Sequence, residues 1–173
     1  MQSFCIIPAR GGSKRIPKKN IRLFRGKHMI AWSIDAAIKS NCFDKIFVST
    51  DSKEIASIAK DYGAWVPCLR PKNLSDDYST TKEVIVHCLD WLKQNDVSPN
   101  YVCCLYATAP FVRAGDLKNG FELVNKKIRK VIINKFWNNR VKILKLLSIF
   151  LVKNKKREEN KTKIFIHSNK LPS

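Results

Sequence analysis

The chain of 173 residues carries 33 lysines and arginines against 14 aspartates and glutamates, a formal net charge of +19 at pH 7. With 45% hydrophobic and 27% charged residues, its composition is that of a globular protein with one domain and a core, which excludes a collagen-like, low-complexity or mostly disordered chain. The surplus of positive charge favours anionic partners such as nucleotides, nucleic acid or anionic lipid.

Strands and helices are expected to alternate over the first 127 residues. Two segments fit capping boxes, Asp51-Ser52-Lys53-Glu54 and Thr80-Thr81-Lys82-Glu83, and Gly63 fits the position after a helix end. In chain order we expect a strand over 4–7, a basic loop over 8–28, a helix over 29–40, a strand over 45–49, a helix over 51–62, a short strand over 65–68, an irregular loop, a helix from 80 to about 95, a strand over 101–106 and a helix from 115 to about 127.

This alternation predicts an α/β, Rossmann-like fold with a mostly parallel sheet that has helices on both faces. The run YVCCLY at 101–106 is apolar on both sides, as in the middle of such a sheet. Ligands of these folds bind at the carboxyl ends of the strands. The loops over 8–27, 50–51, 69–81 and 107–113 are therefore expected to hold any site.

The loop after the first strand, PARGGSKRIPKKN, has the composition of a phosphate cradle. From Arg10 to Lys27 the chain holds eight basic residues and no acidic one. Gly11 and Gly12 would let the backbone turn and bring its N–H groups to an anion, and Ser13 adds a hydroxyl donor. Arg10 can grip a phosphate with two hydrogen bonds, and Lys19 can act on it as a point charge. The loop matches neither G-x-x-x-x-G-K-[ST] nor G-x-G-x-x-G, so spacing alone also allows a generic basic loop.

Four longer strings occur in a fixed order over residues 4–127: IPARGGSKRIPKKNI, FDKIFVSTDSKEIA, LRPKNLSDDYSTT and YATAPFVRAGDL. In order and spacing they resemble the motifs of the acylneuraminate cytidylyltransferase family, the CMP-sugar synthetases. Within that family, YATAPF is most similar to the corresponding stretch of the pseudaminic acid cytidylyltransferases. Sialic acid enzymes typically have Q-P-T-S-P-L-R there, so Tyr106 stands in place of a glutamine.

The resemblance implies transfer of CMP from CTP to a nonulosonic acid, a nine-carbon keto-sugar acid of the pseudaminic or sialic type, with release of pyrophosphate. It also implies Mg²⁺ as cofactor and a homodimer for the intact family. Carried over by motif, Arg10 and Lys19 would act in catalysis, and Tyr106 and Thr108 would contact the sugar. The expected nucleotide-binding residues are Arg10, Gly11, Gly12, Ser13, Lys19, Asn20, Arg70, Ser79, Thr80 and Thr81, and no metal ligand is assigned.

Other roles stay open for several of these residues. Thr80 fits a helix cap equally well, and Asp51 could cap a helix or meet a metal. His28 and His87 are more typical of structural histidines. No cysteines are spaced C-x-x-C, so no zinc site is expected. No apolar run of about 20 residues is recognisable, so no membrane span is expected. The lack of a recognisable signal peptide favours a cytoplasmic protein with reduced thiols.

A change of composition near residue 127 divides the chain into a nucleotide-binding part, 1–127, with net charge +8, and a basic tail, 128–173, with net charge +11. The family motifs end there, and the late aspartates that bind metal in the family have no counterpart, since the carboxylate side chains of the tail are Glu158 and Glu159. Translation of an AT-rich gene in a shifted frame would produce such a tail, and we expect such a truncated chain to be inactive.

Alternatively, the tail is functional. A helix over 141–152 with lysines at its edges would suit an anionic membrane surface, and the basic surplus would suit nucleic acid. The sequence contains no recognisable nucleic-acid motif, and much of the charge of residues 1–127 lies in the phosphate loop, so we expect no nucleic-acid partner for that part.

Overall fold

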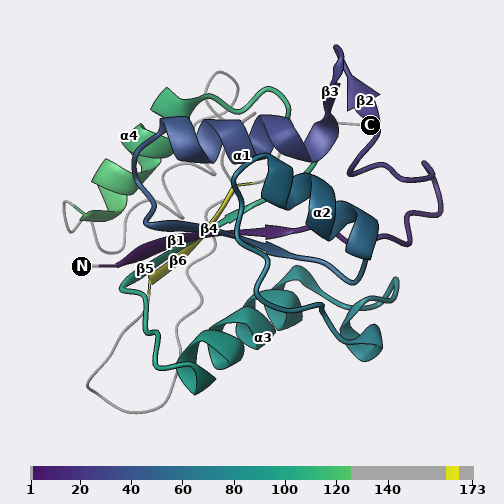
Figure 1. Cartoon of the computed structure of the whole chain (residues 1–173). Helices are drawn as coiled ribbons and strands as arrows, with labels where there is room; N and C mark the ends of the chain where they lie inside the picture. Colours follow the sequence, from purple (N-terminus) through teal and green to yellow (C-terminus); the bar gives the residue numbers. More distant parts are fainter. Residues whose placement is uncertain (1, 126–162, 168–173) are drawn as a thin grey trace, which may run out of the picture.

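The computed structural model describes residues 2–125 and 163–167, which form an α/β sandwich around a parallel sheet (Figure 1). The strands of this sheet lie in the order β4-β1-β5-β6, and every neighbouring pair is parallel. The elements are β1 (Ser3–Pro8), β2 (Leu23–Phe24), β3 (Lys27–His28), α1 (Met29–Lys39), β4 (Lys45–Ser49), α2 (Lys53–Asp61), a 3₁₀ turn η1 (Lys72–Leu74), α3 (Thr81–Gln94), β5 (Tyr101–Leu105), α4 (Ala114–Asn125) and β6 (Lys163–His167).

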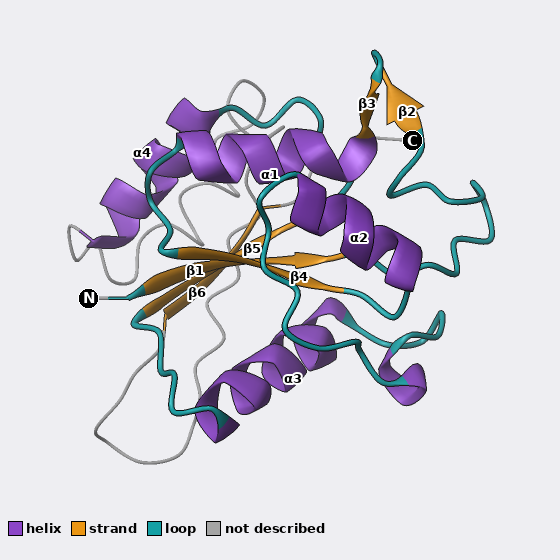
Figure 2. Cartoon of the chain, in the orientation of Figure 1, coloured by secondary structure: helices purple, strands orange, loops and turns teal. Residues whose placement is uncertain are grey.

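Helices cover both faces of the sheet, with α1, α2 and α4 on one side and α3 on the other (Figure 2). Alternate side chains of β1 serve the two layers, because successive residues of a strand point to opposite faces. Cys5 and Ile7 belong to the core under α1, α2 and α4, whereas Phe4 and Ile6 belong to the core under α3. All five residues of β5 are buried, so the expected parallel, doubly covered sheet is confirmed.

The predicted ends of α1, α2 and α3 and the predicted start of α4 agree with the structure to within one residue, except at the start of α2. The predicted end of α4 near 127 lies outside the described residues. Thr80 caps α3 in a complete capping box with Glu83, and Gly63 follows α2 with a φ of +84°. The expectation that Asp51 caps α2 is wrong by one residue. Ser52 is the cap, its hydroxyl accepting the Ile55 N–H at 3.3 Å, and the Asp51 carboxylate is therefore released for other contacts.

Two local predictions differ from the structure. The strand expected over 65–68 is reduced to isolated bridges at Trp65 and Leu69 beside β4, because Pro67 has no N–H for a continuous ladder. The basic loop, conversely, contains the short antiparallel hairpin β2–β3, whose turn places Arg25 and Gly26 at positive φ. Neither strand of the hairpin is long enough to show alternation in the sequence.

The predicted boundary at residue 127 and the tail helix over 141–152 lie outside the described residues. Of the tail, the structure describes the backbone of β6, which pairs with β5 from Tyr101↔Lys163 to Leu105↔His167. In the described part of the chain, no helix is both long and apolar enough to cross a membrane.

Candidate functional site

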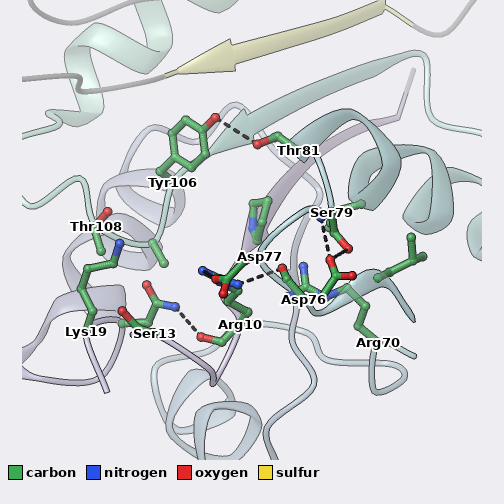
Figure 3. A pocket seen from close by; sticks show the side chains of 15 residues that line it. Arg10, Ser13, Lys19, Arg70, Asp76, Asp77, Ser79, Thr81, Tyr106 and Thr108 are labelled. Carbon is green, nitrogen blue, oxygen red and sulfur yellow. Dashed lines mark hydrogen bonds and ion pairs between the residues drawn. The ribbon is translucent and has the colours of Figure 1, made fainter. Parts of the chain in front are cut away.

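A cavity of about 240 Å³ lies where the chain leaves β1 and β5, at the start of α3 (Figure 3). Its position is the one expected for a ligand site in a parallel sheet, because loops from neighbouring strands meet at the carboxyl edge. The cavity is lined by Pro8, Arg10, Ser13, Lys19, Asn20, Arg70, Leu74, Asp76, Asp77, Ser79, Thr81, Val84, Tyr106, Ala107 and Thr108. Apart from Gly11, Gly12 and Thr80, every predicted site residue contributes to this lining.

Arg10 is held across the cavity by the turn that precedes α3. Its guanidinium donates to the Asp76 carbonyl at 2.8 Å and pairs with the Asp77 carboxylate at 2.5 Å, and Lys14 meets the other Asp77 oxygen at 2.6 Å. Lys14 and Arg10 together hold the pKa of Asp77 below its usual range, because their hydrogen bonds and charges favour the ionised form. A carboxylate thus sits between two cations of the predicted phosphate cradle.

The turn that carries Asp77 is built around the side chain of Asp76. One Asp76 oxygen accepts from the Ser79 hydroxyl at 2.6 Å and from the N–H groups of Ser79 and Tyr78 at 2.7 and 3.1 Å. The two hydrogen bonds from Ser79 lower the pKa of Asp76 most, and the bond from Tyr78 lowers it further. The turn is therefore built around an ionised Asp76 carboxylate. Figure 3 shows Asp76 and Ser79 side by side at one wall of the cavity.

Arg70 is a buried cation in the floor of the site, with its side chain only 3% exposed. Its Nε donates to the Ser75 hydroxyl at 3.2 Å, and one terminal nitrogen lies 3.9 Å from Asp51 Oδ1. Burial lowers the pKa of Arg70, and the negative charge of Asp51 opposes that shift. An arginine without its usual hydration is suited to gripping an anionic or polar ligand group.

The two glycines of the loop do not present an anion nest in the expected way. The Gly11 N–H donates to Asp51 Oδ1 at 2.8 Å, so it is committed within the protein, and the Ser13 N–H donates to the Gly11 carbonyl at 2.9 Å. Neither Gly11 nor Gly12 has a positive φ or lines the cavity. Gly11 is instead needed for close approach, because a Cβ there would lie 3.1 Å from the Ser52 Cβ.

The remaining predicted residues, Asn20, Ser13, Lys19 and Thr108, all line the cavity. Asn20 is buried and donates through its side chain to the Arg10 carbonyl at 2.8 Å, which fixes the backbone of the cradle. Ser13, Lys19 and Thr108 lie together on the side of the cavity away from Arg70 (Figure 3). This arrangement leaves one ammonium and two hydroxyl groups facing the same space.

Tyr106 directly follows β5, and its side chain contacts the start of α3. Its hydroxyl lies 3.1 Å from the Thr81 hydroxyl, and its carbonyl accepts from the buried Ser33 of α1 at 2.8 Å. Thr80, by contrast, is outside the cavity lining, and its side chain is engaged with Glu83 in the capping box. For Thr80 the structure therefore supports the capping role, and not a place in the pocket.

Sequence reasoning missed Asp76 and Asp77, although both stand in the string LSDDYSTT. The signal was present as an acidic pair in a loop expected to face a loop of opposite charge. Their proximity to Arg10 depends on how two distant loops fold, which charge pattern alone does not determine.

The described residues do not fit a resident Mg²⁺ ion. Between 2 and 125, no group of three or more histidine, cysteine or acidic side chains comes together as a metal site. The two carboxylates at the cavity are also engaged, Asp77 by Arg10 and Lys14, and Asp76 by Ser79 and Tyr78. Mg²⁺ is usually held by one or two carboxylates together with substrate phosphates and water, so an ion here would need the oxygens of a bound nucleotide as well as a carboxylate released from its present partners.

Comparisons with known proteins place this site in context. The sequence model of a family described as "Cytidylyltransferase" matches residues 4–171, and so extends past the motif-bearing part. The pseudaminic acid cytidylyltransferase of Campylobacter jejuni subsp. jejuni serotype O:23/36 (strain 81-176) is 46% identical over 144 residues, 83% of this chain and 57% of that protein. The CMP-N,N′-diacetyllegionaminic acid synthase of Legionella pneumophila is 43% identical over 123 residues, 71% of this chain and 53% of that protein.

Among solved structures, CMP:2-keto-3-deoxy-manno-octonic acid synthetase complexed with CTP matches with a TM-score of 0.63 and 19% identity, over 75% of this chain and 49% of that one. At that identity the match supports the fold alone. The chain spans little more than half the length of these two curated relatives. The family match covers nearly the whole sequence, and its motifs converge on one cavity, so the chain belongs to the cytidylyltransferase family.

Proposed function

We propose that the cavity binds CTP and serves the transfer of CMP to a nonulosonic acid of the pseudaminic type, with release of pyrophosphate. The observation that carries this proposal is the convergence of residues from three separate motifs, around Arg10, Arg70 and Tyr106, on one cavity at the carboxyl edge of the sheet. The identity to the pseudaminic and legionaminic enzymes supports the sugar class.

In this proposal the chain's own residues position the reactants and neutralise charge, which are the main contributions to phosphoryl and nucleotidyl transfer. Arg10 and Lys19 hold the triphosphate, Ser13 donates a hydroxyl hydrogen bond to it, and Arg70 contacts the nucleoside side. Tyr106 and Thr108 face the incoming sugar acid. The Mg²⁺ implied by the family would need oxygen ligands beyond the described carboxylates, such as those of the triphosphate, so no step is assigned to it.

The homodimer and the cytoplasmic location implied at the outset belong to the same proposal. The expectation that residues 1–173 bind CTP weakly and do not by themselves catalyse CMP transfer is also part of this proposal. A tail acting on nucleic acid or anionic lipid is the competing function, and it predicts binding that weakens steeply with salt and is unaffected by changes at Arg10.

The test is calorimetric titration of the full chain with CTP, with ATP and UTP for comparison. A pyrophosphate-release assay with CTP and pseudaminic acid is run in parallel, and residues 1–173 are expected to release none. We expect binding selective for CTP and reduced by changes in the cavity. Equal binding of all three nucleotides, or CTP binding unchanged by replacement of Arg10, would contradict the proposal.

Replacement of Asp77 by asparagine is expected to strengthen CTP binding about threefold, because Arg10 and Lys14 then lose the carboxylate that competes with the triphosphate. The lowered pKa of Asp77 fixes the sign of the pH dependence. Its ion pairs are complete above the ordinary aspartate pKa and are lost as the pH falls through the lower pKa of the folded state. The gain from D77N should accordingly shrink toward acid pH. Titrations at several pH values measure this, and weaker binding by D77N would contradict it.

Replacement of Gly11 by alanine is expected to weaken CTP binding about fivefold, because the new methyl group would press on the cap of α2 and displace the loop. Gly12 offers a matched control, since a Cβ there meets no heavy atom within 4 Å. Titration of both variants with CTP measures the difference. Equal affinities of G11A and G12A would show that the close approach of Gly11 is unimportant.

A further inference from the structure

Asp51 lies at the meeting point of three chain segments that build the site. It lies two residues after the end of β4, and the register of β4 against β1 brings Pro8 beside Ser49. The Ala9 N–H donates to the Ser49 carbonyl at 2.9 Å, and the Arg70 N–H donates to the Thr50 carbonyl at 2.7 Å. The start of the phosphate loop and the segment carrying Arg70 are therefore bound to Ser49 and Thr50, the two residues that precede Asp51.

The Asp51 carboxylate contacts both of these neighbours through one oxygen. Its Oδ1 accepts the Gly11 N–H at 2.8 Å and lies 3.9 Å from a terminal nitrogen of Arg70. The carboxylate is free to do this because Ser52, and not Asp51, caps α2. Asp51 is outside the lining of the cavity, so any effect on a ligand has to act through residues it holds.

The contacts of Asp51 with Arg70 and with Gly11 each stabilise a part of the site. A guanidinium that is almost entirely buried needs a compensating negative charge, and among the described residues the ion pair of Arg70 is with Asp51. The loop, in turn, is seated tightly, with the Gly11 backbone so close to Ser52 that a Cβ would meet it at 3.1 Å. One carboxylate thus fixes the backbone next to Arg10 and the side chain of Arg70 with respect to each other.

We propose that Asp51 is a positioning residue of the nucleotide site, which holds the phosphate loop through the Gly11 N–H and the buried Arg70 through its charge. This inference rests on the proposed CTP-binding function for its effect on affinity. The hydrogen bond to Gly11 is independent of any ligand, and its test does not require CTP.

Two substitutions separate the two contacts. In Asp51→Asn the side-chain oxygen still accepts the Gly11 N–H, but the charge facing Arg70 is lost, whereas Asp51→Ala removes both. Asp61→Asn is the matched control, because Asp61 is an exposed carboxylate at the far end of α2 and outside the cavity lining. Thermal unfolding of each variant establishes that it is folded, and D51N keeps the test available should D51A unfold.

The first measurement is hydrogen exchange of a peptide covering residues 9–14 in the full chain without ligand. We expect faster exchange in D51A and wild-type exchange in D51N and D61N, since the bond to Gly11 survives in the latter two. Exchange in D51A equal to that of the wild type would overturn the proposal. The exchange result does not depend on whether the chain binds CTP. Failure of the proposed function would be recognised separately, because the wild type would then not bind CTP.

The second measurement is CTP affinity in a double-mutant cycle. D51N is expected to weaken binding about threefold and D51A about tenfold, while D61N leaves it unchanged. In an Arg70→Gln background the effect of D51N should disappear, because no buried cation then faces residue 51. A general loss of stability would persist in that background, so an undiminished D51N effect there would also overturn the proposal.

Discussion

Replacement of Arg10 by alanine is expected to weaken CTP binding by about a hundredfold, the largest effect of any single change in the cavity. Arg10 is the residue whose guanidinium reaches across the site, and it now bonds the Asp76 carbonyl and the Asp77 carboxylate. A triphosphate taking the place of Asp77 would receive two charge-assisted hydrogen bonds from it, each stronger than a neutral one. Titration calorimetry with CTP measures the loss.

The same loop provides a control of equal charge. Arg15 is exposed and does not line the cavity, so Arg15→Ala removes one positive charge from the loop without removing a ligand contact. We expect R15A to change CTP binding less than about threefold, through long-range attraction alone. If R10A and R15A weakened binding equally, the loop would act as a diffuse basic patch, and the specific role of Arg10 would be wrong.

Replacement of Phe47 by alanine is expected to lower the free energy of unfolding by about 3–5 kcal/mol, because it removes the largest fully buried side chain and leaves a cavity. Phe47 lies on β4 and packs against Trp65 and Trp91, with ring centroids 5.4 and 6.1 Å away. These contacts join the edge of the sheet to α3. Urea denaturation followed by tryptophan fluorescence measures the change.

Phe111 serves as the comparison for this variant. Its ring is 63% exposed and makes an edge contact with Phe24 at 5.8 Å. Phe111→Ala should therefore cost no more than about 1 kcal/mol. A loss for F47A no greater than that for F111A would mean that the aromatic cluster under α3 does not stabilise the fold as described.

The two predictions also separate binding from folding. R10A changes a partly exposed side chain at the carboxyl edge of the sheet and should leave the unfolding transition nearly unchanged. F47A acts on the core and should reduce CTP binding only where the fold itself is lost. Measuring affinity and unfolding for both variants assigns each residue to the site or to the core.

Much of the local structure is determined by short stretches of sequence. The short runs with apolar residues at 4–7, 46–48 and 101–105 form strands, as expected for segments of this length that are buried on both faces of a parallel sheet. Thr80 and Glu83 form a capping box because its atoms are only three residues apart. The loops that follow parallel strands meet at one edge of the sheet, so the alternation of strands and helices predicted a site among the loops over 8–27 and 69–81. The place of Tyr106 came from the family resemblance, and the structure has Arg10, Arg70 and Tyr106 lining one cavity.

The contacts within that cavity were decided by tertiary structure. Arg10 meets Asp76 across 66 residues and Gly11 meets Asp51 across 40, and both distances depend on strand register and on the path of two loops. Sequence pattern assigned the Gly11 N–H to an anion and left Asp51 open as a helix cap or a metal contact, whereas in the fold the Gly11 N–H donates to the Asp51 carboxylate. Periodicity and caps are encoded by neighbouring residues, but the partner of a polar group in a loop is set by whichever distant group the folded sheet brings within hydrogen-bonding distance.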